Sequence, residues 1–187
     1  ERVQSFAEYQ RHLNVLINAG RLQDSTKIWW DLRPSGRFPT LETRIMDVCT
    51  RLDDAVALAA LLVCIMRMLY RLRLHNQRWR IYTAMLIREN RWRAMRYSFD
   101  EGLIDLAKGK VVPFGELLGE LLTLTADDAA ALGCTDEVNS LRDVLGRGTS
   151  AHRQLAAYKA VREEGADDDD ALKAVVDRLV TDTAAGL

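Results

Sequence analysis

A run of apolar residues at 55–66, "AVALAALLVCIM", limits the fold of this chain more than any other feature of the sequence. Twelve successive residues without a charge favour a helix that is apolar nearly all round, and such a helix belongs in the interior of a domain. The pattern predicts a helix from about residue 51 to residue 76, with Thr50 as N-cap and Asp53 as the acidic partner of a capping box. The run is shorter than the roughly 20 residues that span a bilayer, so the sequence predicts no membrane segment.

Helical patterns fill most of the remaining chain, and two stretches break them. Residues 27–47 and about 103–113 each indicate a pair of antiparallel strands around a turn, with Gly109 in the second turn. The expected helices are residues 5–18, 84–98, 114–124, 126–132, 135–147, 149–164 and 168–183. A chain of 187 residues with 48% hydrophobic residues is long enough for one domain with its own core. The expected fold class is therefore α+β.

The arginines are unevenly distributed along the chain. Residues 67–96 contain nine arginines and no lysine against one acidic residue, Glu89, although the formal net charge of the whole chain is −1. Arginine without lysine favours planar recognition or buried pairing over simple solubility. Three interpretations stay open for this stretch: an arginine-lined wall that contacts acidic residues or an anionic substrate, a nucleic-acid-binding surface, and a solvated helix face.

The cysteines indicate a reducing environment. Cys49, Cys64 and Cys134 are an odd number, lie far apart and have no zinc-ligand spacing. Reduced thiols are typical of cytosolic proteins, so a cytoplasmic location is expected.

Residues 27–47 carry the most informative pattern of charges. Read as two strands around "RPSGRFP", the stretch alternates with period two. Asp31 and Arg33 share one face of the first strand, and Glu42 and Arg44 share one face of the second. The opposite faces are apolar, with Ile28, Trp30 and Leu32 in the first strand and Leu41 and Ile45 in the second. Leu41 and Ile45 are expected to anchor their face in the core.

Two interpretations of the charged strand face stay open. Paired carboxylates and guanidinium groups suit a site for Mg²⁺ and polyphosphate, because carboxylate oxygens satisfy a hard cation and guanidinium forks bind phosphate oxygens bidentately. The alternative is a solvated strand face whose ion pairs each contribute less than about 1 kcal/mol.

Three blocks occur in order along the chain: "IWWDLRPSGRFPTLETRIMDV", "NQRWRIYTAMLIRENRWRAMRY" and "GTSAHRQLAAY". Together they resemble the C-terminal half of the glutamate–cysteine ligase type 2 family, from about residue 5 to the final "TAAGL". The sequence departs from the family at Ser98, where the family usually carries glycine. The resemblance implies that residues 1–187 are a single region of a carboxylate–amine ligase, with a fragment of a glutamine-synthetase-like antiparallel sheet and a mostly helical C-terminal region.

The resemblance also implies a reaction and the residues that serve it. The family joins the γ-carboxylate of L-glutamate to L-cysteine through a γ-glutamyl phosphate, with ATP and Mg²⁺. Glu42 is then the expected metal ligand, and Arg44 the expected catalytic residue that faces the transferred phosphoryl group and binds ATP. Arg33 is expected in catalysis and, with Asp31, in substrate binding. Asn90 and Arg93 are expected to bind the cofactor.

An N-terminal half that supplies other metal ligands is absent from this sequence, so the isolated chain is expected to be inactive. The expected partners are that missing half, glutamate, and cysteine or another amine, with no nucleic acid and no membrane. Homo-oligomer formation stays open. Two alternative classes also stay open: a non-catalytic helical scaffold with the family's fold, and an arginine-rich nucleic-acid-binding protein.

Overall fold

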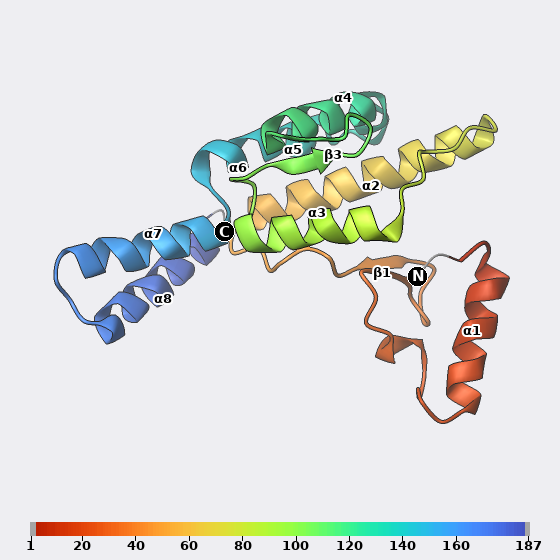
Figure 1. The fold of residues 1–187 in the computed structure, drawn as a ribbon, viewed down its shortest axis with the longest axis horizontal. Coiled ribbons are helices and arrows are strands. Elements are labelled where there is room, and N and C mark those ends of the chain that lie inside the picture. Colours follow the sequence, from red (N-terminus) through yellow and green to blue (C-terminus); the bar gives the residue numbers. More distant parts are fainter. Residues whose placement is uncertain (1–2, 186–187) are drawn as a thin grey trace. The chain divides into compact units, whose positions relative to one another are not determined.

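The computed structural model describes residues 3–185 of the chain (Figure 1). The chain forms two compact units, Glu1–Val48 and Cys49–Leu187. Helices predominate in the described residues, and the strands form two separate two-stranded antiparallel sheets. The α+β composition expected from the sequence is therefore present.

The first unit contains a helix, a short 3₁₀ turn and a two-stranded ribbon. These are α1 (Phe6–Asn18), η1 (Ser25–Lys27), β1 (Leu32–Pro34) and β2 (Leu41–Thr43). α1 begins where the side chain of Ser5 accepts a hydrogen bond from the backbone N–H of Glu8. Tyr9 of α1 is buried, and its ring meets the ring of Trp30 edge-on, with the centroids 5.9 Å apart. This contact holds α1 against the chain that enters β1.

The ribbon is shorter than the sequence predicts. β1 and β2 pair over three residues each, with Arg33 directly opposite Glu42. Residues opposite one another in an antiparallel pair point to the same side, so the charged side chains share a face as predicted. The apolar face is different: Leu41 is 45% exposed and Ile45 is 58% exposed. The prediction that these two residues pack in the core is wrong, because nothing in the described part of the unit covers them.

The second unit is built on two long helices, α2 (Leu52–Leu74) and α4 (Phe114–Leu132). Leu61 and Cys64 of α2 lie in one buried cluster with Leu118 and Leu122 of α4, and α5 (Thr135–Asn139) and α6 (Leu141–Arg147) close the same core. The buried residues of α2 recur every three or four positions, at 57, 61, 64 and 68, which places one stripe of the helix in the core. The central position predicted for this helix is confirmed on that face.

The start of α2 differs from the prediction. Its N-cap is Arg51, and no side chain forms a capping hydrogen bond there. Thr50 instead accepts a hydrogen bond at its hydroxyl from Nη2 of Arg153, at 3.1 Å. A residue distant in the sequence therefore takes the hydroxyl group that the local pattern assigned to the helix end.

Five further elements complete the second unit. α3 (Ala84–Tyr97) leads into a hairpin of β3 (Leu103–Asp105) and β4 (Lys110–Val112), and α7 (Ser150–Glu163) and α8 (Asp168–Ala184) form a helical hairpin. The β3–β4 hairpin and the turn at Gly109, with φ 66°, are confirmed.

Residues 114–132 form one helix where two were predicted, because Thr125 is buried and its hydroxyl donates to the Leu121 carbonyl of the same helix. Residues 135–147 form two short helices where one was predicted, and the hydroxyl of Ser140 donates to the carbonyl of Glu137 at the break.

By length and composition alone, α2 is apolar enough to cross a membrane. Its mean hydropathy is 2.0 over a window of 18 residues, and 22% of that window is buried. The sequence-based prediction rested on the uncharged run at 55–66 alone, which is too short to span a bilayer. An 18-residue window that allows two charged residues extends beyond that run and meets the length and hydropathy criteria. Core helices of globular domains pass the same test, and one face of α2 lies in such a core.

Candidate functional site

Glu42 lies between two arginines on the charged face of the ribbon. Its Oε2 accepts a hydrogen bond from Nε of Arg33 at 2.7 Å and lies 2.6 Å from Nη2 of the same guanidinium. Its Oε1 lies 2.6 Å from Nη2 of Arg44. The hydrogen bond from Arg33, together with the two positive charges, holds the pKa of Glu42 below its ordinary value. The carboxylate is therefore anionic at neutral pH, and both of its oxygens are engaged.

Arg33 is buried, and most of its donors already have protein partners. Besides the contact with Glu42, its Nη1 donates to the backbone carbonyls of Thr26 and Ile28 at 2.6 and 2.7 Å. The guanidinium thus fastens the Glu42 carboxylate to the η1 turn. These contacts favour a positioning role for Arg33, and the direct role in catalysis or substrate binding that the sequence suggested stays a prediction.

Arg44 is the more accessible of the two arginines. Its side chain is 38% exposed, against 7% for Arg33. Its guanidinium lies over the ring of Trp29, with Cζ 5.2 Å from the ring centroid. The backbone N–H of Arg44 donates to the carbonyl of Asp31 at 2.8 Å, which extends the ribbon by one residue pair. The structure therefore brings all four predicted ribbon residues together in one unit.

A cavity of about 270 Å³ opens beside Arg33 and Glu42. Its other lining residues come from the η1 turn and from the loop between the strands: Asp24, Ser25, Thr26, Ser35, Gly36 and Arg37. A side chain at position 36 would collide with the hydroxyl of Ser25, so glycine keeps this wall of the cavity open. The cavity gives the charged face a concave surface that the strand pattern alone did not predict.

Sequence reasoning missed the η1 residues of this cavity. Asp24 caps the turn, because its carboxylate accepts a hydrogen bond from the N–H of Thr26 at 2.7 Å. Hydrogen bonds from the Thr26 hydroxyl and N–H hold the pKa of Asp24 below its ordinary value. The only signal in the sequence is "DST", which is typical of turns in general and does not distinguish a site from an ordinary turn.

Asn90 and Arg93 lie on α3 in the second unit, where both bind backbone atoms. The Asn90 amide donates to the carbonyl of Ile104 in β3 and accepts from its N–H, both at 2.8 Å. Nη2 of Arg93 donates to the carbonyl of Glu101 at 2.8 Å. These contacts hold α3 on the chain that forms β3, and a role in cofactor binding stays a prediction for both residues.

The arginines of residues 67–96 do not form the predicted wall. Arg67 and Arg71 pair with the carboxylate of Asp128, which is fully buried on α4. Most of the others are exposed and have no ion pair with a described carboxylate: Arg73, Arg78, Arg80, Arg88 and Arg96. The expectation that most of these arginines contact carboxylates or a pocket is therefore wrong. α2 and α3 are too thinly covered in this chain to bury them.

The side chains of residues 3–185 do not form a metal site by themselves. No group of three or more His, Cys, Asp or Glu side chains in this range could hold a metal ion. Mg²⁺ is usually bound through one or two carboxylates together with substrate phosphates and water. Oε2 of Glu42 meets two nitrogens of Arg33, but Oε1 meets only Nη2 of Arg44 and keeps one acceptor position. This part of the chain therefore offers at most one ligand of a magnesium site and not a complete site.

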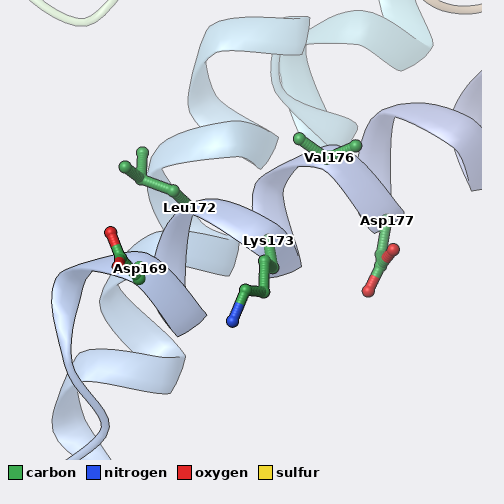
Figure 2. A pocket seen from close by; sticks show the side chains of 5 residues that line it. All are labelled: Asp169, Leu172, Lys173, Val176 and Asp177. Carbon is green, nitrogen blue, oxygen red and sulfur yellow. The ribbon is translucent and has the colours of Figure 1, made fainter.

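A second depression, of about 380 Å³, lies on α8 (Figure 2). Figure 2 shows its side chains projecting from a single helix: Asp169, Leu172, Lys173, Val176 and Asp177. Because one helix supplies every lining residue, no opposing element can hold a ligand against it. The cavity beside the ribbon is the better candidate for a functional site.

The fold and the ribbon define a helix-rich α+β protein with a carboxylate held between two guanidinium groups at a cavity. The sequence model of Glutamate-cysteine ligase family 2 (GCS2) matches residues 1–177. The chain belongs to this family, which confirms the resemblance found in the three sequence blocks.

Relatives in several bacteria share nearly the whole chain. The sequence is 61% identical over 183 residues to a protein of Rhodospirillum rubrum, 54% over 178 residues to one of Jannaschia sp., and 47% over 179 residues to one of Paracoccus denitrificans. Each carries the name "Putative glutamate--cysteine ligase 2". The matches cover 98%, 95% and 96% of this chain but 47%, 47% and 48% of those proteins. The chain therefore spans about half the length of these relatives.

Proposed function

We propose that this chain is one part of an ATP-dependent carboxylate–amine ligase that joins the γ-carboxylate of L-glutamate to L-cysteine. The observation that carries the proposal is the Arg33–Glu42–Arg44 arrangement in a chain that belongs to the glutamate–cysteine ligase family 2. In such a reaction a γ-glutamyl phosphate forms first, and the amine then displaces phosphate. Both steps develop negative charge on phosphoryl oxygens, which preorganised cationic groups stabilise.

Arg44, Arg33 and Glu42 would have different roles, which follow from how accessible each side chain is. Arg44 has the accessible guanidinium, so it would face the transferred phosphoryl group of ATP. Arg33 is buried and would hold Glu42 in place. Glu42 would supply one carboxylate ligand to the Mg²⁺ that accompanies ATP, and that ion neutralises phosphate charge when bound. Asp31, opposite Arg44 on the ribbon, would position glutamate.

Nucleotide binding by Asn90 and Arg93, which lie in the second unit, is proposed on the family resemblance alone. Their polar atoms are occupied by the backbone at Glu101 and Ile104, so they would act through the segment they hold. Their proposed role is therefore indirect, whereas the accessible guanidinium of Arg44 would contact the nucleotide directly.

The proposal includes further strands from outside this chain. A two-stranded ribbon is only marginally stable by itself in water. The apolar face of this ribbon is exposed at Leu32, Leu41 and Ile45. A glutamine-synthetase-like sheet would add neighbouring strands and cover that face. Since the chain spans about half the length of its relatives, we expect the isolated chain to be inactive. The proposed use of ATP agrees with a cytoplasmic location.

The proposal can be tested by trapping the acyl phosphate in the complete protein that contains this chain. With glutamate, ATP and Mg²⁺, hydroxylamine should intercept the activated carboxylate and give γ-glutamyl hydroxamate, with one ADP formed for each hydroxamate. Replacing hydroxylamine by a panel of amines, cysteine among them, then identifies the amine substrate. Absence of hydroxamate with glutamate, in protein that is folded and binds ATP, would overturn the proposed activity. A faster reaction with another amine would support the proposed ligase reaction but show that cysteine is not the preferred amine substrate.

A further inference from the structure

α2 has a second apolar face, opposite the one that lies in the core. Leu52, Val56, Val63, Tyr70 and Leu74 are spaced by four, seven, seven and four residues, which keeps them on one side of a helix. They are 48%, 45%, 51%, 64% and 64% exposed. On the inner face, Leu61 is 8% exposed and Cys64 is fully buried. The outer face thus carries core-type residues in a solvent-accessible position.

A helix that is apolar on two opposite faces is normally covered on both. α4 and α5 cover the inner face of α2. The outer face runs the length of the helix, and an exposed apolar strip of this kind marks an interaction site rather than a random scatter of surface residues. Interfaces inside obligate assemblies have this composition, because they resemble a domain core cut in half.

We propose that the outer face of α2 is the docking surface for the part of the family's domain that lies outside this chain. The relatives are about twice as long as this chain, so a segment of similar size is available to cover it. That segment would bring an apolar surface of its own against Val63 and Tyr70. The proposal rests on family membership and exposure and concerns binding, so it stands or falls separately from the proposed activity.

The experiment co-expresses the tagged 187-residue chain with the part of the Rhodospirillum rubrum relative that the chain does not match. Co-purification and a titration give the affinity of the pair. Val63→Asp, on the outer face, is compared with Val176→Asp on α8, because the two valines are similarly exposed, at 51% and 57%. We expect Val63→Asp to weaken binding at least about tenfold, as expected for a charge placed within an apolar interface. Val176→Asp should change the affinity by less than about twofold.

Folding of the variants is checked by thermal melting of the chain alone, with Leu61→Asp as the inner-face comparison. If the outer face is open in this chain, Val63→Asp keeps the melting temperature of the wild type and Leu61→Asp lowers it strongly. A loss of stability in Val63→Asp equal to that in Leu61→Asp shows that the face is already covered within this chain and overturns the proposal. Tyr70→Asp provides a second test of binding on the same face.

Four further results would overturn the proposal. They are no binding by the wild-type chain, equal weakening by Val63→Asp and Val176→Asp, a dimer of the 187-residue chain that Val63→Asp dissolves, and binding to phosphatidylcholine–phosphatidylglycerol vesicles that Val63→Asp abolishes. The dimer would assign the surface to a second copy, and the vesicle result would assign it to a membrane.

Discussion

Arg33 and Glu42 face each other across the β1–β2 ribbon, and two nitrogens of the buried guanidinium reach the same carboxylate oxygen at 2.7 and 2.6 Å. The other side of that guanidinium is bound to carbonyls of Thr26 and Ile28. If the carboxylate rotated away, the guanidinium, which is held by these carbonyls, would be left buried without its counter-charge. One ion pair links the predicted catalytic face to the fold of the first unit.

Replacing Glu42 by glutamine in the complete enzyme should lower the turnover number at least about 100-fold, the scale seen when one preorganised electrostatic group is lost. Glutamine keeps the shape but removes the negative charge that a hard cation requires. The melting temperature should also fall, because the buried Arg33 loses its counter-charge. Steady-state turnover and thermal unfolding of the same preparation measure both effects.

Glu163→Gln is the matched control for that change, since Glu163 is exposed on α7, far along the chain from the ribbon. It should leave turnover and melting temperature unchanged. Near-normal turnover in Glu42→Gln, with a lowered melting temperature, would leave Glu42 a purely structural residue.

Replacing Arg44 by lysine separates charge from geometry. Lysine keeps the positive charge but loses the planar fork and the stacking on Trp29. Turnover should fall at least about 100-fold while the melting temperature stays near that of the wild type, because Glu42 keeps its contact with Arg33. Arg21→Lys, at an exposed position in the same unit, is the control. Equal turnover in the two variants would show that the fork of Arg44 has no part in the reaction.

The sequence predicted the shared charged face and its four residues because strand alternation is a local property. It could not predict that Arg33 is buried and Arg44 accessible, since that difference arises from carbonyls of the η1 turn. For the same reason the pattern placed Leu41 and Ile45 in a core. The pattern shows which residues share a face, whereas burial depends on what covers it, and nothing in the described part of the first unit does so.

In the helices, too, features that depend on local residue spacing were predicted, and features that depend on residues distant in the sequence were not. The apolar stripe of α2 follows from spacing alone and was predicted. The role of Thr50 was not, because its hydroxyl is taken by Arg153, which follows much later in the chain. The pairing of Arg67 and Arg71 with Asp128 was likewise beyond a local pattern, since it joins α2 to α4.

Ser98 is predicted to strain the end of α3. It has φ 53° and ψ −124°, a backbone conformation that favours glycine. Ser98→Gly should raise the free energy of unfolding by up to about 1 kcal/mol, as strain relief exceeds the added flexibility of the unfolded chain. Asn76→Gly is the comparison, because Asn76 has φ 56° and asparagine tolerates left-handed geometry. Urea unfolding measures both, and a destabilised Ser98→Gly would refute the strain.

Asp128 is predicted to be the most sensitive charged residue of the second unit. It is fully buried and pairs with Arg67 and Arg71, whose side chains are 40% and 41% exposed. Asp128→Asn leaves both guanidinium groups without their counter-charge. The free energy of unfolding should fall by about 2–3 kcal/mol, less than for a fully buried pair because water still reaches the arginines. Asp127→Asn, one residue earlier and exposed, should change it by less than about 0.5 kcal/mol in the same urea titration.

Acid should unfold the second unit through its buried carboxylates. The hydrogen bond from Arg71 holds the pKa of Asp128 below its ordinary value, although burial opposes it. Burial acts to raise the pKa of Asp182, but the hydrogen bond and charge of Arg153 and the charge of Arg178 bring it below the ordinary value. A carboxyl group with a lowered pKa in the folded state binds fewer protons there than in the unfolded chain. Its contribution to stability is therefore complete above the unfolded pKa and is lost as the pH falls through the folded one.

The melting temperature should consequently be flat near neutral pH and fall below about pH 5, where the unfolded chain begins to take up protons that the folded protein excludes. Asp128→Asn should flatten this fall, because one of the groups that drives it no longer titrates. Asp127→Asn should keep the wild-type profile. Thermal melts between pH 7 and pH 2.5 at constant ionic strength measure the three curves. An identical acid limb in Asp128→Asn and the wild type would mean that the Arg67–Asp128–Arg71 cluster does not control acid stability.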